Sequence, residues 1–187
     1  MKTKIERREA SSFSDYLSLT VATCGVGYSP IAPGTCGSVV GVAIYLCVEW
    51  AVAAFAVSEF GHGGRITEPF YAYVHAVICI LLFAYSLFGI WAAGRSTVLL
   101  GNSDASQIVV DEVMGQLVTF LFIPFTFSWK MILAGFLLFR LFDIWKPFPI
   151  DDLQALPSGI GVCADDIIAG VYAGIVLVVI YALGFLL

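Results

Sequence analysis

The sequence predicts an all-α membrane protein: a compact multihelical bundle of about five membrane-embedded helices, preceded by a short N-terminal helix. Of its 187 residues, 60% are hydrophobic and 12% are charged, whereas about 25% of the residues of a soluble domain are charged. Residues 69–94 include no charged side chain, and none follows Asp166. Both stretches are as long as the roughly 20 apolar residues that a membrane-spanning helix needs.

The loops between the apolar runs are too short to fold alone, so we expect one helical domain, residues 15–187, after a polar tail at residues 1–14. Residues 15–24 are expected to form the short helix. The Gly- and Pro-rich residues 25–38 are expected to be irregular. The apolar runs place the embedded helices at about 38–58, 70–93, 113–127, 130–144 and 166–187.

The N-terminal tail is basic at Lys2, Lys4, Arg7 and Arg8. Basic residues beside a membrane span favour the cytoplasmic side. Alternating crossings then place the loops 94–112 and 145–165 on the cytoplasmic side, together with the irregular segment. The loop 59–69 is placed on the opposite side.

Composition argues against several classes of protein. The net charge of −5 disfavours a nucleic-acid partner, and no feature indicates an obligate protein partner. The five cysteines are scattered and form no Cys-x-x-Cys pair, so neither a disulfide framework nor a zinc site is predicted. The two histidines, His62 and His75, lie away from the predicted cytoplasmic face, which disfavours a histidine-based phosphoesterase.

Acidic residues mark the junctions between the predicted cytoplasmic loops and the helices. They are Asp111, Glu112, Asp143, Asp165 and Asp166. Burying carboxylates is costly unless a cation neutralises them, and a ligand set made only of oxygen favours Mg²⁺, Mn²⁺ or Ca²⁺. A subset of these residues is therefore predicted to bind a divalent cation. The alternative is helix capping, in which each acidic pair only stabilises the start of its own helix.

Arg140, Asp143 and Lys146 follow one another at intervals of three residues, which places them on one face of a helix. An Arg inside an apolar run usually faces a protein interior or a cavity. Guanidinium and ammonium groups both bind phosphate, so Arg140 and Lys146 are candidate phosphate-binding residues, with Asp143 at the metal. The alternative is a salt bridge between Arg140 and Asp143, with Lys146 reaching toward the membrane interface.

The segment GVGYSPIAPGTCGS at residues 25–38 is a third candidate. Its glycines allow the backbone to approach a ligand, and a helix beginning near Thr35 would direct N–H groups toward an anion. Gly34 and Thr35 are therefore candidate phosphate-binding residues. Thr35 could instead cap that helix, and an ordinary turn is the simplest interpretation of the segment.

Four segments together, GVGYSPIAPGTCGS, IVVDEVMGQ, GFLLFRLFDIWKPFPI and GIGVCADDIIAGV, resemble the phosphatidylglycerophosphatase A family in order and spacing. The resemblance covers about residues 20–180. It implies a multihelical, Mg²⁺-dependent enzyme of the bacterial inner membrane. The loop placement above puts its active site on the cytoplasmic side. The implied reaction belongs to phospholipid biosynthesis: hydrolysis of the terminal phosphate of the lipid phosphatidylglycerophosphate to phosphatidylglycerol and inorganic phosphate, a phosphoric monoester hydrolase activity.

With this function, Asp143, Asp166 and Glu112 are the candidate catalytic residues. Mg²⁺ held by a subset of the carboxylates would neutralise the phosphate and lower the pKa of a bound water. Arg140 and Lys146 would stabilise charge on the phosphoryl oxygens. The sequence leaves open which carboxylate acts as base. It also leaves open whether a carboxylate forms a phosphoenzyme, although direct attack by water is favoured.

A small cation transporter or channel with an acidic cytoplasmic mouth is the alternative function. Glu49 and Arg140 would then be pathway residues within the membrane. A pore requires polar residues repeated along several helices, whereas here the polar groups gather at one end and Glu49 is nearly isolated.

Overall fold

The computed structural model describes residues 6–61, 68–102, 105–124 and 126–184. Within these ranges every regular element is a helix, which confirms the predicted all-α class. The helices are α1 (Phe13–Thr23), the 3₁₀ helix η1 (Val26–Tyr28), α2 (Pro33–Phe60), α3 (Glu68–Leu100), α4 (Val110–Phe120), α5 (Trp129–Trp145), α6 (Ile150–Leu153) and α7 (Ser158–Ala182). Most of the predicted loop 59–69, and the start of the predicted tail, lie outside the described residues.

Three helices are long and apolar enough to cross a membrane: α2, α3 from Pro69 onward, and α7. The expected third and fourth embedded helices correspond to α4 and α5, with 11 and 17 residues. Both are shorter than the roughly 20 residues that a complete crossing requires. The membrane-embedded count of five therefore stays a prediction, as does the division into a tail and one domain.

Several helix boundaries differ from those expected. α2 begins at Pro33, because proline at the first helical position has a suitable φ and lacks an N–H that would have no partner there. The helix predicted at 113–127 was too long, since α4 ends at Phe120. α7 begins at Ser158, well before the predicted start at residue 166. Glycines near its start lower helix propensity, but tertiary packing favours them: a Cβ at Gly159 would collide with the carbonyl of Ile90 on α3.

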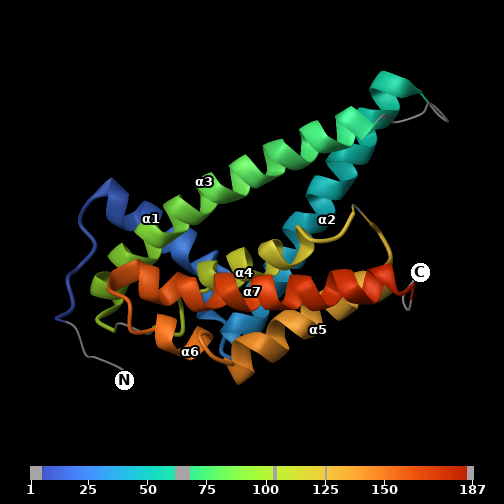
Figure 1. The fold of residues 1–187 in the computed structure, drawn as a ribbon. Helices are drawn as coiled ribbons and strands as arrows, with labels where there is room; N and C mark the ends of the chain where they lie inside the picture. Colours follow the sequence, from blue (N-terminus) through green and yellow to red (C-terminus); the bar gives the residue numbers. More distant parts are fainter. Residues whose placement is uncertain (1–5, 62–67, 103–104, 125, 185–187) are drawn as a thin grey trace.

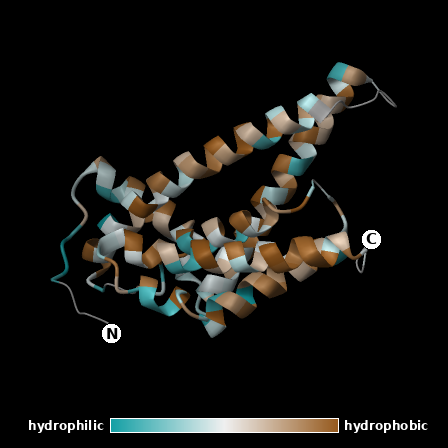
Figure 2. Ribbon diagram, in the orientation of Figure 1, coloured by the Kyte–Doolittle hydropathy of each residue, from teal (hydrophilic) through white to brown (hydrophobic). Residues whose placement is uncertain are grey.

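The helix α7 runs through the bundle beside α4 and α5, while α2 and α3 form a long hairpin that projects from it (Figure 1). The start of α2, the end of α3, the start of α4, the end of α5 and the start of α7 all lie at one end of the bundle. Apolar residues dominate the long helices, and hydrophilic ones are frequent near α6 at that same end (Figure 2). The helix order therefore brings residues far apart in the sequence to one polar end.

Glycines allow α4 and α7 to approach backbone to backbone. A Cβ at Gly170 would collide with the carbonyl oxygen of Gly115, and one at Gly115 would collide with the carbonyl oxygen of Asp166. A similar contact joins α2 to α4, where a Cβ at Gly37 would lie 2.9 Å from the Cβ of Val109. This close packing places the first turn of α4 between α2 and α7.

Two polar anchors hold the outer parts of the fold. Asp15 on α1 forms ion pairs with Arg8 and Arg95, and its carboxylate also accepts hydrogen bonds from the amides of Ser11 and Ser12 at 3.1 Å. The amide of Ser11 is the largest influence on the pKa of Asp15. Together with the Ser12 hydrogen bonds and the charge of Arg8, it outweighs burial and holds that pKa well below its usual range. This network ties the N-terminal segment to α3.

The second anchor explains Glu49, a charged residue type inside the apolar run of α2. Its side chain is buried, and its Oε1 accepts a hydrogen bond from the amide of Thr126 at 3.1 Å. The hydroxyl of Tyr45, one turn earlier on α2, donates to the carbonyl of Thr126 at 3.2 Å. Glu49 therefore secures the α4–α5 connection to α2.

Candidate active site

A cavity of about 550 Å³ opens at the polar end of the bundle. Five helices contribute to its walls: the start of α2, the end of α3, the start of α4, the end of α5 and the first half of α7. All five acidic residues singled out from the sequence line it, as do both basic ones and one glycine: Asp111, Glu112, Asp143, Asp165, Asp166, Arg140, Lys146 and Gly34. Thr35 does not belong to the described lining.

Three of the carboxylates form a compact group. Asp111, Glu112 and Asp166 each place an oxygen so that all three atoms lie within 4.8 Å of one another. Asp111 Oδ1 and Glu112 Oε2 are buried and have no hydrogen-bond partner among the described residues. Buried carboxylate oxygens without donors are costly, and a group of them is typical of a divalent cation site. The donor set therefore fits Mg²⁺.

The pKa values of the two carboxylates on α4 also indicate a cation site. Burial raises the pKa of Asp111 well above its ordinary value, and the negative charges of Glu112 and Asp166 raise it further. Burial also raises the pKa of Glu112. Each shift reflects the cost of holding negative charge in a buried group of like charges, and a bound cation would remove that cost.

The position of Asp165 and Asp166 excludes capping as their role. They lie about two turns inside α7, whose first turn contains no acidic residue. Neighbouring helix residues point about 100° apart, so the two side chains serve different parts of the cavity. Asp166 joins the group on α4, whereas Asp165 faces Lys146.

Asp111 and Glu112 do lie in the first turn of α4, where a negative charge also interacts favourably with the helix dipole. Capping in the strict sense is absent there, because the N-cap residue is Val109 and no side chain caps that end. The helix dipole therefore stabilises the negative charge of the same two carboxylates that line the cavity.

The two basic residues are each paired with an aspartate at the cavity wall. Arg140 Nη1 lies 2.6 Å from Asp143 Oδ2 and donates to the hydroxyl of Ser38 on α2 at 3.4 Å. Lys146 Nζ lies 2.6 Å from Asp165 Oδ2. Burial alone would lower the pKa of Lys146, but the hydrogen bond and charge of Asp165 outweigh it and raise that pKa. The salt bridge between Arg140 and Asp143, which the sequence offered as the alternative to phosphate binding, is thus present, and both side chains line the cavity as well.

Gly34 lies in the first turn of α2, directly against Glu112. A Cβ there would collide with Glu112 Oε1 and lie 3.5 Å from Arg140 Nη1. Only a residue without a side chain allows α2 to come this close. Thr35 neither lines the described part of the cavity nor caps α2, whose N-cap is Ala32 without a side-chain hydrogen bond.

Several polar residues in or beside the site were not predicted. Gln116 follows Glu112 by one turn of α4, is fully buried, and its amide has no hydrogen-bond partner within the described chain. Its spacing from Glu112 places it on the same helix face, a signal that was available in the sequence. Ser38 on α2 was identifiable only through its contact with Arg140. Thr97, Ser106, Gln154 and Ser158 line the cavity itself, whereas Gln116 and Ser38 are not among its described lining residues.

The arrangement combines carboxylates able to hold a cation with two fixed cationic side chains, all facing one cavity beside apolar helices. Such a site is suited to a phosphate group, because guanidinium and ammonium groups bind its oxygens and a divalent cation neutralises its charge. The exposed side chains of Ile144, Trp145 and Phe148 lie at the adjoining end of α5. Trp, as at position 145, is enriched at the membrane–water interface.

Comparisons with known proteins agree with this chemistry. A relative from Bacteroides thetaiotaomicron, named "Putative phosphatidylinositol-3-phosphatase", is 32% identical over 160 residues, covering 83% of this chain and 87% of its own. Two proteins named phosphatidylglycerophosphatase A are also similar. The one from Haemophilus influenzae is 34% identical over 81% of this chain and 80% of its own. The one from Escherichia coli is 32% identical over 79% of this chain and 73% of its own.

No solved structure matches the chain. The family model described as phosphatidylglycerophosphatase A matches residues 19–181, which include every residue described as lining the cavity. The chain therefore belongs to the phosphatidylglycerophosphatase A family of membrane lipid phosphatases.

Proposed function

We propose that this phosphatase hydrolyses the terminal phosphate of phosphatidylglycerophosphate, giving phosphatidylglycerol and inorganic phosphate in phospholipid biosynthesis. One observation carries the proposal: Asp111, Glu112 and Asp166 gather in the same cavity as Arg140 and Lys146. The family and the names of two relatives support the substrate. We place the enzyme in the bacterial inner membrane, with the cavity facing the cytoplasm.

The lipid nature of the substrate is supported by where the cavity lies. It opens at one end of helices that are long and apolar enough to cross a membrane, so a headgroup can enter while its acyl chains stay in the bilayer. Ile144, which lines the cavity, is 74% exposed, and the next residue of α5, Trp145, is exposed as well. An apolar edge beside a polar cavity suits an amphiphile better than a soluble phosphate ester.

Arg140 and Lys146 are proposed to bind the phosphate. Both are held at the cavity wall by their ion pairs, at 2.6 Å to Asp143 and to Asp165 respectively, so little side-chain freedom is lost when the phosphate binds. Arg140 supplies a planar pair of donors and Lys146 a point charge. Both stabilise the negative charge spread over the equatorial oxygens during phosphoryl transfer.

Asp111, Glu112 and Asp166 are proposed to hold Mg²⁺, since their oxygens converge and two of them have no other described partner. When bound, Mg²⁺ neutralises phosphate charge and lowers the pKa of a coordinated water. Asp143 and Asp165 remain paired with the basic residues at the rim of this group.

Direct attack by water is the proposed reaction. Asp143 lies outside the converging group and lines the same cavity, so we assign it as the base that takes the proton from the attacking water. The water oxygen forms the new P–O bond, and the bond from phosphorus to the headgroup oxygen breaks. The proton taken by Asp143 then neutralises the released alkoxide.

A phosphoinositide is the second candidate substrate, because one relative carries the name of a phosphatidylinositol-3-phosphatase. Both candidates are phosphate monoesters on a phospholipid headgroup, so the same cavity chemistry serves either. The cation transporter is not supported, because the hydrogen bond from the Thr126 amide assigns Glu49 a structural role.

Phosphate release by the purified full-length protein in lipid–detergent micelles tests the proposal. We expect release from phosphatidylglycerophosphate to exceed that from phosphatidylinositol 3-phosphate, to stop with a chelator, and to return with Mg²⁺. The reverse preference would reassign the substrate to the phosphoinositide. Phosphate release from neither lipid, by protein that remains folded, would overturn the proposal.

A further inference from the structure

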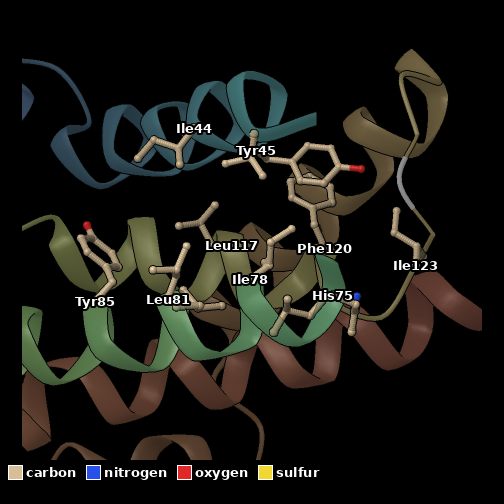
Figure 3. A pocket seen from close by; sticks show the side chains of 12 residues that line it. Ile44, Tyr45, His75, Ile78, Leu81, Tyr85, Leu117, Phe120 and Ile123 are labelled. Carbon is tan, nitrogen blue, oxygen red and sulfur yellow. The ribbon is translucent and has the colours of Figure 1, made fainter. Parts of the chain in front are cut away.

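A second cavity lies between α2 and α3, away from the carboxylates. At the loop end of the hairpin these helices touch through aromatic rings, with centroids 6.1 Å apart for Phe55 and Phe70 and 5.3 Å for Phe60 and Phe70. Further along they diverge, and α4 lies between them (Figure 1). The space they leave has a volume of about 210 Å³. Figure 3 shows Ile44 of α2 and Leu117 of α4 among its lining side chains.

The surroundings of this cavity indicate the chemistry of its occupant. Its lining residues on α2 and α3 lie within the two segments able to cross a membrane, so the surrounding medium is hydrocarbon. The lining is almost wholly apolar, and the hydroxyl of Tyr45 already donates to Thr126. An apolar cavity inside a bilayer is filled by an apolar group.

The size of the cavity selects the occupant among apolar groups. A protein cavity of about 150 Å³ accommodates benzene, so a cavity of 210 Å³ holds a segment of one acyl chain. An α-helix with its side chains is about 10 Å across and does not fit. A single acyl chain fits, whereas a helix from a second copy does not.

The length and polarity of the cavity agree with an acyl chain. His75, Ile78, Leu82 and Tyr85 line it along one face of α3, a distance of about 15 Å at the helical rise. Half of the hydrocarbon core of a bilayer is also about 15 Å. His75 marks the end nearest the hairpin loop, where an imidazole suits the ester region of a lipid. A lipid bound there would belong to the leaflet on the hairpin side, opposite the carboxylate cavity.

This cavity is separate from the one that holds the carboxylates, because α4 lies tightly packed between the two. A Cβ at Gly89 on α3 would lie 3.1 Å from Met114 and from Val110, and one at Gly41 on α2 would lie 2.8 Å from Gln116. We infer that the α2–α3 cavity binds one acyl chain of a second phospholipid, distinct from the substrate. Its chain packs on Leu117 of α4, the helix that carries Asp111 and Glu112.

Photolabelling tests this inference without relying on phosphatase activity. The full-length protein in nanodiscs is exposed to phosphatidylethanolamine with a diazirine in the middle of one acyl chain, and labelled peptides are mapped by mass spectrometry. We expect strong labelling of the peptides that contain residues 75–85 and 117–123. Ile78→Trp fills the cavity and should reduce that labelling several-fold, and Ile44→Phe from the α2 side should do the same.

Ile80→Trp is the matched control, because Ile80 is 67% exposed on the same helix and does not line the cavity. It should leave the labelling of these peptides unchanged. Equal labelling of wild type, Ile78→Trp and Ile44→Phe would overturn the inference. Cross-links from these peptides to a second copy of the chain, in place of lipid, would overturn it as well. Because the readout is the label, its failure is distinguishable from a failure of phosphate release.

Discussion

The carbonyl oxygen of Gly115 on α4 lies directly against the Cα of Gly170 on α7, leaving no room for a side chain between the two helices. One turn before Gly170, the carbonyl of Asp166 occupies the matching position against Gly115. These contacts set the separation of α4 from α7, and with it the distance between the carboxylates of Glu112 and Asp166. The candidate metal site therefore depends on glycines that carry no chemistry themselves.

Gly170→Ala is predicted to lower both stability and phosphate release. The added methyl forces α7 away from Gly115, and overpacking of this kind costs about 1–3 kcal/mol. Thermal unfolding in detergent and phosphate release measure the two effects. Ile175→Ala is the control, because Ile175 is 49% exposed on the same helix. If Gly170→Ala retained wild-type stability and activity, the close approach of α4 and α7 would have no role in forming the site.

Asp166→Asn is predicted to abolish phosphate release while the protein without divalent cation unfolds no earlier than wild type. Removing one charge relieves repulsion among Asp111, Glu112 and Asp166, whose oxygens lie within 4.8 Å of one another. A ligand at 100 times its Kd stabilises a protein by about 2.7 kcal/mol, and this Mg²⁺-dependent gain should be lost in the variant. Melting curves with and without Mg²⁺ measure it.

Asp152→Asn on α6 provides the comparison for Asp166→Asn, because Asp152 is exposed and does not line the cavity. It should keep both the activity and the gain from Mg²⁺. An Asp166→Asn protein that Mg²⁺ stabilises as strongly as wild type would remove Asp166 from the metal ligands.

Arg140→Ala is predicted to lower kcat by about 100-fold, the loss typical when a group that stabilises transition-state charge is removed. Arg140→Lys should recover only part of this, because an ammonium cannot bind two phosphate oxygens as a guanidinium does. Steady-state kinetics with the lipid substrate test both variants. Lys130→Ala, at the exposed start of α5, should behave as wild type. Full activity in Arg140→Ala would show that Arg140 has no role in catalysis beyond its salt bridge with Asp143.

Asp15 is predicted to make folding sensitive to acid. Its pKa in the folded protein is held below the unfolded value of 3.8, chiefly by the amide of Ser11. The ionised carboxylate therefore stabilises the fold above the unfolded pKa, and this stabilisation is lost as pH falls through the folded value. Asp15→Asn should melt earlier than wild type at neutral pH, with the difference shrinking below about pH 4. A difference independent of pH would show that the charge of Asp15 contributes nothing.

The helices were largely predictable, because long apolar runs leave the chain few alternatives in a membrane. The convergence of the acidic and basic residues also followed from the sequence, since helices that alternate in direction bring residues 111–112, 140–146 and 165–166 to one end of the bundle. The start of α7 did not, because tight contacts of glycines such as Gly159 with α3 stabilise a segment that resembles a loop. That difference moved Asp166 from an apparent helix cap to the interior of a helix.

The finer features of the site depend on tertiary contacts that no local pattern contains. The hydrogen bond from Arg140 to Ser38 joins residues on α5 and α2, and the pairing of Lys146 with Asp165 depends on how α5 lies against α7. Thr35 was predicted to bind phosphate because it belongs to the Gly- and Pro-rich segment. Among the described lining residues, however, α2 contributes Pro33 and Gly34 and not Thr35. The α2–α3 cavity exists because the two helices diverge, and their sequences alone do not determine that angle.

The most direct measurement is an experimental structure of the protein with Mn²⁺ in place of Mg²⁺, with the ion located by its anomalous scattering. The account predicts one ion bound by Asp111, Glu112 and Asp166, in the cavity that Arg140 and Lys146 also face. An ion bound elsewhere, or no ion among these carboxylates at saturating Mn²⁺, would contradict it.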